Sequence, residues 1–165
     1  MIQRRLLIVW HSRTGASEAL ARAAAEGAAR EAAIETVRLP AAAAGPDDLI
    51  AAQGYIFAAP ENLATLSGEM KAFLDRSYYP ALDRIAGRPY AAIIAAGSAG
   101  DGAARQLARI ARGWRLKPVA EPWIIITDAQ TPDAILARKR LPSEPIAQAA
   151  DLGHTLAAGL ALGMF

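Results

Sequence analysis

The chain has 165 residues, of which 53% are hydrophobic and 21% are charged. This length suits a single domain spanning residues 1–165, and the composition is typical of a globular protein. The net charge of +2 is too small to indicate nucleic-acid binding. No apolar run approaches the ~18 residues of a membrane span, and a chain without Cys has no disulfides or thiolate ligands. We therefore expect a cytoplasmic protein.

Strand and helix patterns alternate along the chain. Short apolar runs predict five strands, at residues 6–10, 34–39, 54–60, 89–96 and 122–127. Apolar residues at helical spacing, and one proline-led segment, predict five helices near residues 20–28, 46–52, 70–77, 103–114 and 146–160. The first apolar run follows two arginines but is too short for a signal peptide.

This alternation predicts an α/β fold in which helices cover both faces of a parallel sheet. In such folds, ligands bind outside the carboxyl ends of the strands, near the point where the strand order reverses. Three segments follow strands at that edge: loop one (11–17), loop two (60–68) and loop three (97–102).

Loop one places three hydroxyl residues, Ser12, Thr14 and Ser17, around Gly15 at the start of a helix. The first N–H groups of a helix lack intrahelical partners, and the helix dipole favours an anion there. Glycine permits a tight turn, and the hydroxyls can donate to phosphate oxygens. The alternative is an ordinary helix cap. We predict a phosphate site.

The sequence excludes two better-known phosphate loops. It contains no G-x-x-x-x-G-K-[ST] motif, so the lysine of nucleotide hydrolases is missing. The glycines of loop three have the spacing G-x-x-G-x-G, which differs from the dinucleotide motif G-x-G-x-x-G. A mononucleotide is the better prediction.

The three loops together resemble those of flavodoxin-like proteins. Loop one resembles the [ST]-x-T-G-x-[ST] loop that binds the phosphate of FMN in that family. Residues 58–76 and 96–108 are similar to the second and third flavin loops of its FMN reductases and quinone reductases. The resemblance covers nearly the whole chain. It implies a flavodoxin-like three-layer sandwich with a five-stranded parallel sheet of order 2-1-3-4-5.

The resemblance also implies which residues hold the FMN. The implied phosphate-binding and ring-binding residues are Ser12, Arg13, Thr14, Gly15, Ala16, Ser17, Pro60, Glu61, Asn62, Leu63, Gly97, Ser98, Ala99 and Asp101. If Glu61 and Asp101 lie close to the ring, they would disfavour an anionic reduced flavin. The alternatives are that loop two is an ordinary connection capped by Ser67, and that loop three is a flexible glycine-rich turn.

Loops two and three contain no aromatic residue, whereas flavodoxins commonly stack aromatic side chains on the ring. Unless Tyr78 or Tyr79 folds back, or a second subunit supplies a ring, one flavin face should stay open, which suits hydride transfer. The resemblance therefore implies NAD(P)H-dependent reduction of FMN, quinones or similar acceptors, in a chain that could pair as a homodimer. The alternatives are a flavodoxin-type electron carrier serving redox partner proteins, and a relative that has lost FMN and binds proteins in its cleft.

Other polar residues carry weaker predictions. His11 should hold loop one or donate to the phosphate, and Arg13 could contact the phosphate or solvent. The basic clusters at 105–117 and 138–140 are typical of solvated surfaces. No spacing indicates a metal site or a catalytic triad. Packing roles are expected for Trp10, Trp114 and Trp123, and a packing or surface role for His154.

Overall fold

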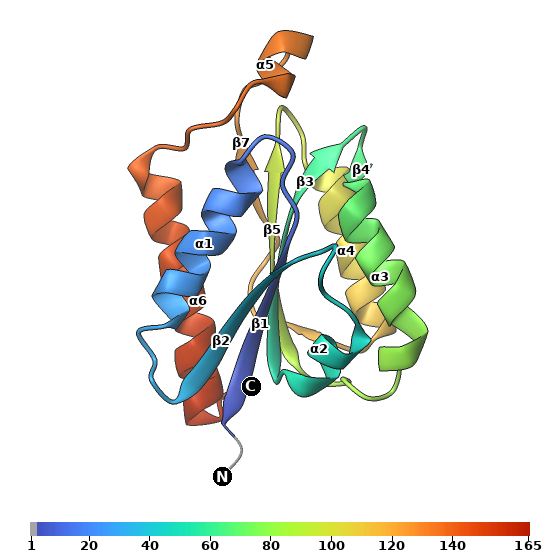
Figure 1. The fold of residues 1–165 in the computed structure, drawn as a ribbon, viewed down its shortest axis with the longest axis vertical. Coiled ribbons are helices and arrows are strands. Elements are labelled where there is room, and N and C mark those ends of the chain that lie inside the picture. The colour runs from blue at the N-terminus through green and yellow to red at the C-terminus, as the bar shows by residue number, and fades with distance from the viewer. Residues whose placement is uncertain (1–2) are drawn as a thin grey trace.

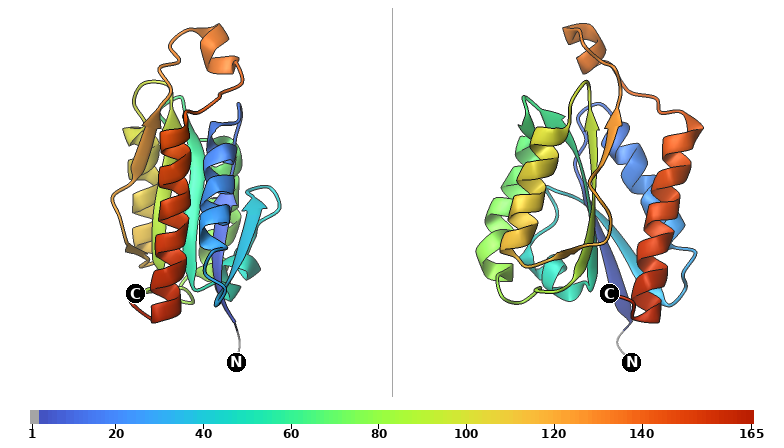
Figure 2. Two further views of the ribbon diagram at one scale, coloured as in Figure 1. Left: turned by 90° about the vertical axis from the view of Figure 1, so that its left-hand side faces the viewer. Right: turned by 180° about the vertical axis from the view of Figure 1, so that it is seen from behind.

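The computed structural model describes residues 3–165; Met1 and Ile2, the first residues of the predicted domain, lie outside the described residues. A central sheet is covered by helices on both faces (Figures 1 and 2). One face carries α1 (Ala16–Ala28) and α6 (Ser143–Leu162). The other carries α2 (Pro46–Ala51), α3 (Gly68–Ala81) and α4 (Asp101–Gly113). These are the predicted helices.

All five predicted strands are present and run parallel in one sheet. They are β1 (Arg4–Trp10), β2 (Ile34–Pro40), β3 (Gly54–Asn62), β5 (Pro89–Ala96) and β7 (Trp123–Ile126). Their registers place Leu6 opposite Gly54 and Ile93 opposite Trp123. The carboxyl ends of these strands therefore meet at one edge of the sheet.

The predicted strand count of five is wrong, because the sheet has seven strands. Five of them follow the order β2-β1-β3-β5-β6, and β4 and β7 pair with β3 and β5 off this path. Antiparallel β4 (Thr65–Leu66) folds back on β3, and β6 (Lys117–Pro118) pairs with β5 below β7. Both extra strands have two residues, too few to show a period of two. Pro118 and Pro122 lack N–H donors, which explains why the last edge is divided into two strands.

The strand side chains alternate between two hydrophobic cores. Leu7 and Val9 of β1 face the core beneath α2, α3 and α4, whereas Leu6 and Ile8 face the core beneath α1 and α6. All four are fully buried. Burial on both faces explains why the first strand has a continuous apolar sequence rather than an alternating one.

Close packing of α1 against α6 fixes the position of loop one. A Cβ atom on Gly153 of α6 would overlap the carbonyl oxygen of Ala24 in α1. A Cβ atom on Gly27 of α1 would likewise overlap the carbonyl oxygen of Ala150. The two helix backbones are thus in direct contact, and α1 holds a defined orientation below the loop.

A short helix, α5 (Pro132–Leu136), was not predicted and projects beyond the carboxyl ends of the strands (Figure 1). Thr131 caps it, accepting a hydrogen bond from the Ala134 N–H at 3.2 Å, and proline occupies its first turn. With five residues and no buried side chain, it has no apolar periodicity to reveal it.

The structure also bears on two other expectations. Within residues 3–165, no helix has the length and apolar character needed to cross a bilayer.

Trp114 is buried, and its indole N–H donates to the carbonyl oxygen of Tyr78 at 2.9 Å. Trp10 and Trp123 are half-buried against the α1 and α6 core. The tryptophans therefore pack as predicted.

Candidate functional site

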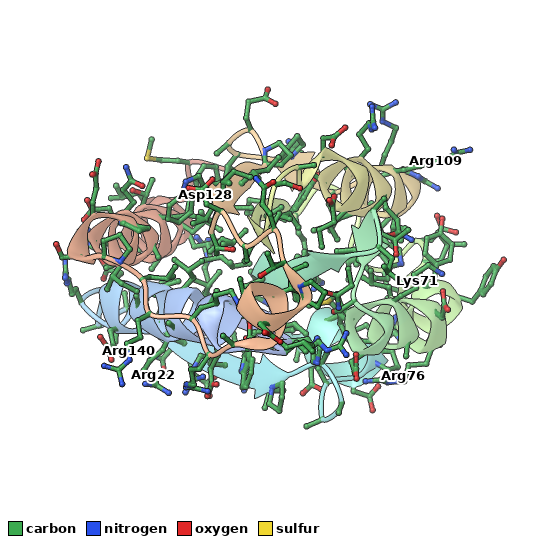
Figure 3. All side chains as sticks on the ribbon, turned by 90° about the horizontal axis from the view of Figure 1, so that it is seen from above. Arg22, Lys71, Arg76, Arg109, Asp128 and Arg140 are labelled. Atoms are coloured by element: carbon green, nitrogen blue, oxygen red, sulfur yellow. The ribbon has the colours of Figure 1, made fainter. Side chains whose placement is uncertain are left out.

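A cavity of about 300 Å³ lies at the carboxyl ends of the strands. Figure 3 looks down on this end, with α5 in front. The predicted residues that line the cavity are Ser12, Arg13, Thr14, Ala16, Ser17, Pro60, Glu61, Asn62, Leu63, Gly97 and Ser98. Gly15, Ala99 and Asp101 do not line it. Segments far apart in the sequence thus surround one space.

Loop one presents backbone donors to this cavity. Gly15 has a φ of 106°, a conformation that side chains disfavour, and its N–H donates to Ser12 Oγ at 2.9 Å. Helix α1 begins at the next residue, and no side chain caps its first N–H groups. The first intrahelical bond comes from Ala19, so the preceding amides of the helix have no acceptor in the described part of the chain. Free donors at a helix start favour an anion.

Ser17 contributes an unpaired hydroxyl at the same helix start. The residue is 1% exposed, and its Oγ has no hydrogen-bond partner among the described residues. Burying a hydroxyl without a partner costs about 1–3 kcal/mol. Because Ser17 also lines the cavity, a ligand with acceptor oxygens would recover that cost.

Loop two turns sharply at the rim of the cavity. Its β3–β4 hairpin places Leu63 and Ala64 in the left-handed region, with φ values of 51° and 65°. Such turns normally use Asn or Gly at these positions. Leu63 is also 99% exposed. An exposed leucine in a strained turn beside a cavity is unfavourable for the chain by itself.

Glu61 links loop two to loop three. One carboxylate oxygen accepts from the Gly100 N–H at 2.9 Å, and the other accepts from the Ala103 N–H at 3.0 Å. The side chain therefore caps the N-terminus of α4, where the helix dipole favours a negative charge. Asp101 instead pairs with Arg105 at 2.8 Å outside the cavity. Glu61 thus lines the cavity with both carboxylate oxygens hydrogen-bonded, whereas Asp101 does not line it.

The pairing of His11 differs from the prediction. Its Nδ1 lies 2.8 Å from Ser67 Oγ, and its Nε2 lies 3.5 Å from the carboxylate of Glu69. Both partners belong to the start of α3, with Ser67 in the cap position. His11 therefore joins the end of β1 to α3 instead of holding the backbone of loop one. The other histidine, His154, is exposed on α6.

Neither candidate tyrosine reaches the cavity. Tyr78 stacks on Trp114 with ring centroids 5.5 Å apart, and Tyr79 is 79% exposed on α3. Among the described residues, none of those lining the cavity is aromatic. The mouth is bordered instead by the aliphatic side chains of Leu63 and Ile135.

Several residues of the cavity wall were not predicted. They are Ala64, Ala95, Ala96, Thr127, Ala129, Ile135 and Lys139. Lys139 departs from the expectation of a solvated basic cluster, because it is half-buried and its main-chain N–H donates to Thr14 O at 2.8 Å. The only sequence signal for the segment that carries Ile135 and Lys139 was the Thr-Pro pair at 131–132, which is a common helix start.

Among the described residues, no cluster of three His, Cys, Asp or Glu could hold a metal ion.

Solved structures of the same fold come from several kinds of protein. A flavodoxin from the domain Archaea superposes with a TM-score of 0.77 at 17% identity, covering 94% of this chain and 98% of that one. A WrbA-like flavodoxin from Agrobacterium tumefaciens has a TM-score of 0.73 at 19% identity, with coverages of 97% and 98%. The flavodiiron protein from Giardia intestinalis reaches 0.77 at 22% identity, but this chain covers only 37% of it.

At these identities the structural likeness establishes the flavodoxin-like fold alone, which confirms that part of the prediction. A search of curated proteins finds no significant match. The model of one family, described as NADPH-dependent FMN reductase, matches residues 40–131, more than half of the chain. The chain therefore belongs to the NADPH-dependent FMN reductase family.

Proposed function

We propose that this chain binds FMN noncovalently in the cavity and catalyses NAD(P)H-dependent reduction of FMN, quinones or similar acceptors. The unpaired hydroxyl of Ser17 is the observation that carries the proposal. A buried hydroxyl without a partner favours a ligand with acceptor oxygens, a helix N-terminus favours an anion, and the phosphate of FMN offers both. The family to which the chain belongs supports the same cofactor.

The residues present fit FMN. At the α1 end, Ser12, Thr14 and Ser17 with the free backbone amides would hold the phosphate. At the other end, the rim formed by Pro60–Leu63 and Gly97–Ser98 would hold the isoalloxazine edge with backbone groups. When bound, FMN would supply acceptance of a hydride and onward transfer of electrons.

The role of the chain is to position the flavin and to surround it with the two ring-side loops. Glu61 ties loop two to α4, so the two ring-side loops keep a fixed separation. The cavity lacks an aromatic lid in the described chain, which leaves room for a nicotinamide or quinone. Hydride transfer needs reacting atoms about 3–3.5 Å apart, so an uncovered ring face favours a reductase.

The second candidate is an electron carrier without a substrate of its own. The superposition with an archaeal flavodoxin over nearly its whole length favours this alternative. The two functions differ in the source of electrons. A reductase takes hydride directly from a nicotinamide, whereas a carrier is reduced by a partner protein.

Anaerobic reduction of the FMN-loaded protein distinguishes these functions. We expect NADPH or NADH to bleach the flavin absorbance within seconds, followed by recovery on addition of a quinone. Free FMN at the same concentration is the control. A loaded protein that stays oxidised with both nicotinamides, yet is reduced by a partner reductase, would refute the reductase and support the carrier.

A further inference from the structure

The segment that follows β7 places basic side chains over loop one. Lys139 donates its main-chain N–H to Thr14 O at 2.8 Å, and its ammonium nitrogen lies 3.5 Å from Thr14 Oγ1. The guanidinium carbon of Arg138 lies 3.1 Å from the position of a Cβ on Gly15. Two cations from one segment thus contact the turn that begins α1.

Helix α5 holds the ammonium of Lys139 in place. That ammonium donates to the carbonyl oxygens of Ala134, Ile135 and Ala137, at 2.8, 3.0 and 2.6 Å. These carbonyls form the C-terminal end of α5, where the helix favours a cation. The bonds orient the ammonium without removing its charge. A lysine anchored in this way loses less conformational entropy on binding an anion than a free lysine.

The charge of the cavity is consistent with an anionic ligand at this end. Among the described lining residues, Arg13 and Lys139 are basic, and Glu61 is the only acidic residue. Both oxygens of Glu61 already accept backbone N–H groups at the start of α4. No carboxylate of the lining therefore competes for Lys139.

We propose that Lys139 is the charge partner of the FMN phosphate and that segment 131–139 acts as a basic clamp on loop one. This inference rests on the proposed function. The clamp makes binding selective for phosphorylated flavin, because riboflavin presents no charge to the ammonium. Arg138 does not line the cavity, so its contribution to FMN affinity should be smaller than that of Lys139.

The test compares FMN with riboflavin in fluorescence-quenching titrations of the full chain. Lys139→Met should weaken FMN about tenfold or more and riboflavin less than about twofold, since the positive charge beside the phosphate is lost. Arg140→Met is the matched control, because Arg140 is the adjacent exposed cation and lies at the outer edge of the molecule (Figure 3). It should leave both affinities unchanged. Added NaCl should weaken FMN binding by the wild type more than by Lys139→Met.

Lys139→Arg separates charge from structure, since it keeps the positive charge but alters the bonds to α5. It should recover most of the FMN selectivity. Equal losses for both flavins in Lys139→Met, or wild-type FMN affinity in that variant, would overturn the inference while leaving FMN binding intact. Failure of the proposed function has a different signature, in which the wild type itself binds neither flavin.

Discussion

Ser17→Ala separates the ligand-binding role of loop one from its role in folding. In the unliganded chain the hydroxyl is buried without a partner, so its removal relieves a desolvation cost of about 1–3 kcal/mol. Alanine is also the better helix former, by about 0.5 kcal/mol. The unliganded variant should therefore be more stable than the wild type, by about 1 kcal/mol or more.

With saturating FMN, the effect of Ser17→Ala on stability should reverse, so that the variant becomes less stable than the wild type. The variant lacks one charge-assisted bond to the phosphate, worth about 1.5–3 kcal/mol, so its FMN affinity should fall about ten- to hundredfold. Urea denaturation with and without saturating FMN measures both effects on one protein. Riboflavin affinity should change little.

Ser77→Ala provides a matched control for this reversal. Ser77 is fully buried in α3, its Oγ is also unpaired in the described chain, and it does not line the cavity. Its replacement should stabilise the chain in the same way without affecting FMN. The reasoning would be refuted if Ser17→Ala bound FMN as tightly as the wild type, or if both variants lost affinity equally.

Three further predictions concern the loops and the core. Glu61→Ala should cost about 2 kcal/mol of stability by uncapping α4 and should weaken FMN and riboflavin alike; a loss confined to FMN would contradict the ring-side position of loop two. Gly153→Ala should lower the free energy of unfolding by about 2 kcal/mol or more, because the new methyl group meets the α1 backbone; a neutral result in urea denaturation would disprove that contact. Burial raises the pKa of Tyr55 to about 12, so the folded chain keeps that proton to higher pH than the unfolded chain. Wild-type stability relative to Tyr55→Phe should consequently fall by about 1 kcal/mol between pH 9 and pH 11, and a constant difference would argue against this titration.

The fold could be predicted from the sequence because its main strands are buried on both faces. The runs at 6–10 and 89–96 are apolar without interruption, and observed strands cover both. Short elements gave no such signal. The β3–β4 hairpin has only two residues in β4, and prolines divide the last edge of the sheet into β6 and β7. Both features depend on local turn geometry rather than on periodicity.

The candidate site was predictable only where sequence motifs mark it. Glycine and hydroxyl residues identify loop one, and the strand ends identify loops two and three. The contact of Lys139 with Thr14 joins residues 125 positions apart, which no local pattern encodes. Likewise, the sequence places Glu61 in loop two but does not reveal that its carboxylate caps α4.

A crystal structure of the chain grown with FMN tests the central claim most directly. The account predicts a phosphate at the N-terminus of α1, with an oxygen about 2.6–3.0 Å from Ser17 Oγ and others bonded to the free amides of that helix start. Density for FMN elsewhere, or a bound flavin that leaves Ser17 Oγ unpaired, would contradict it.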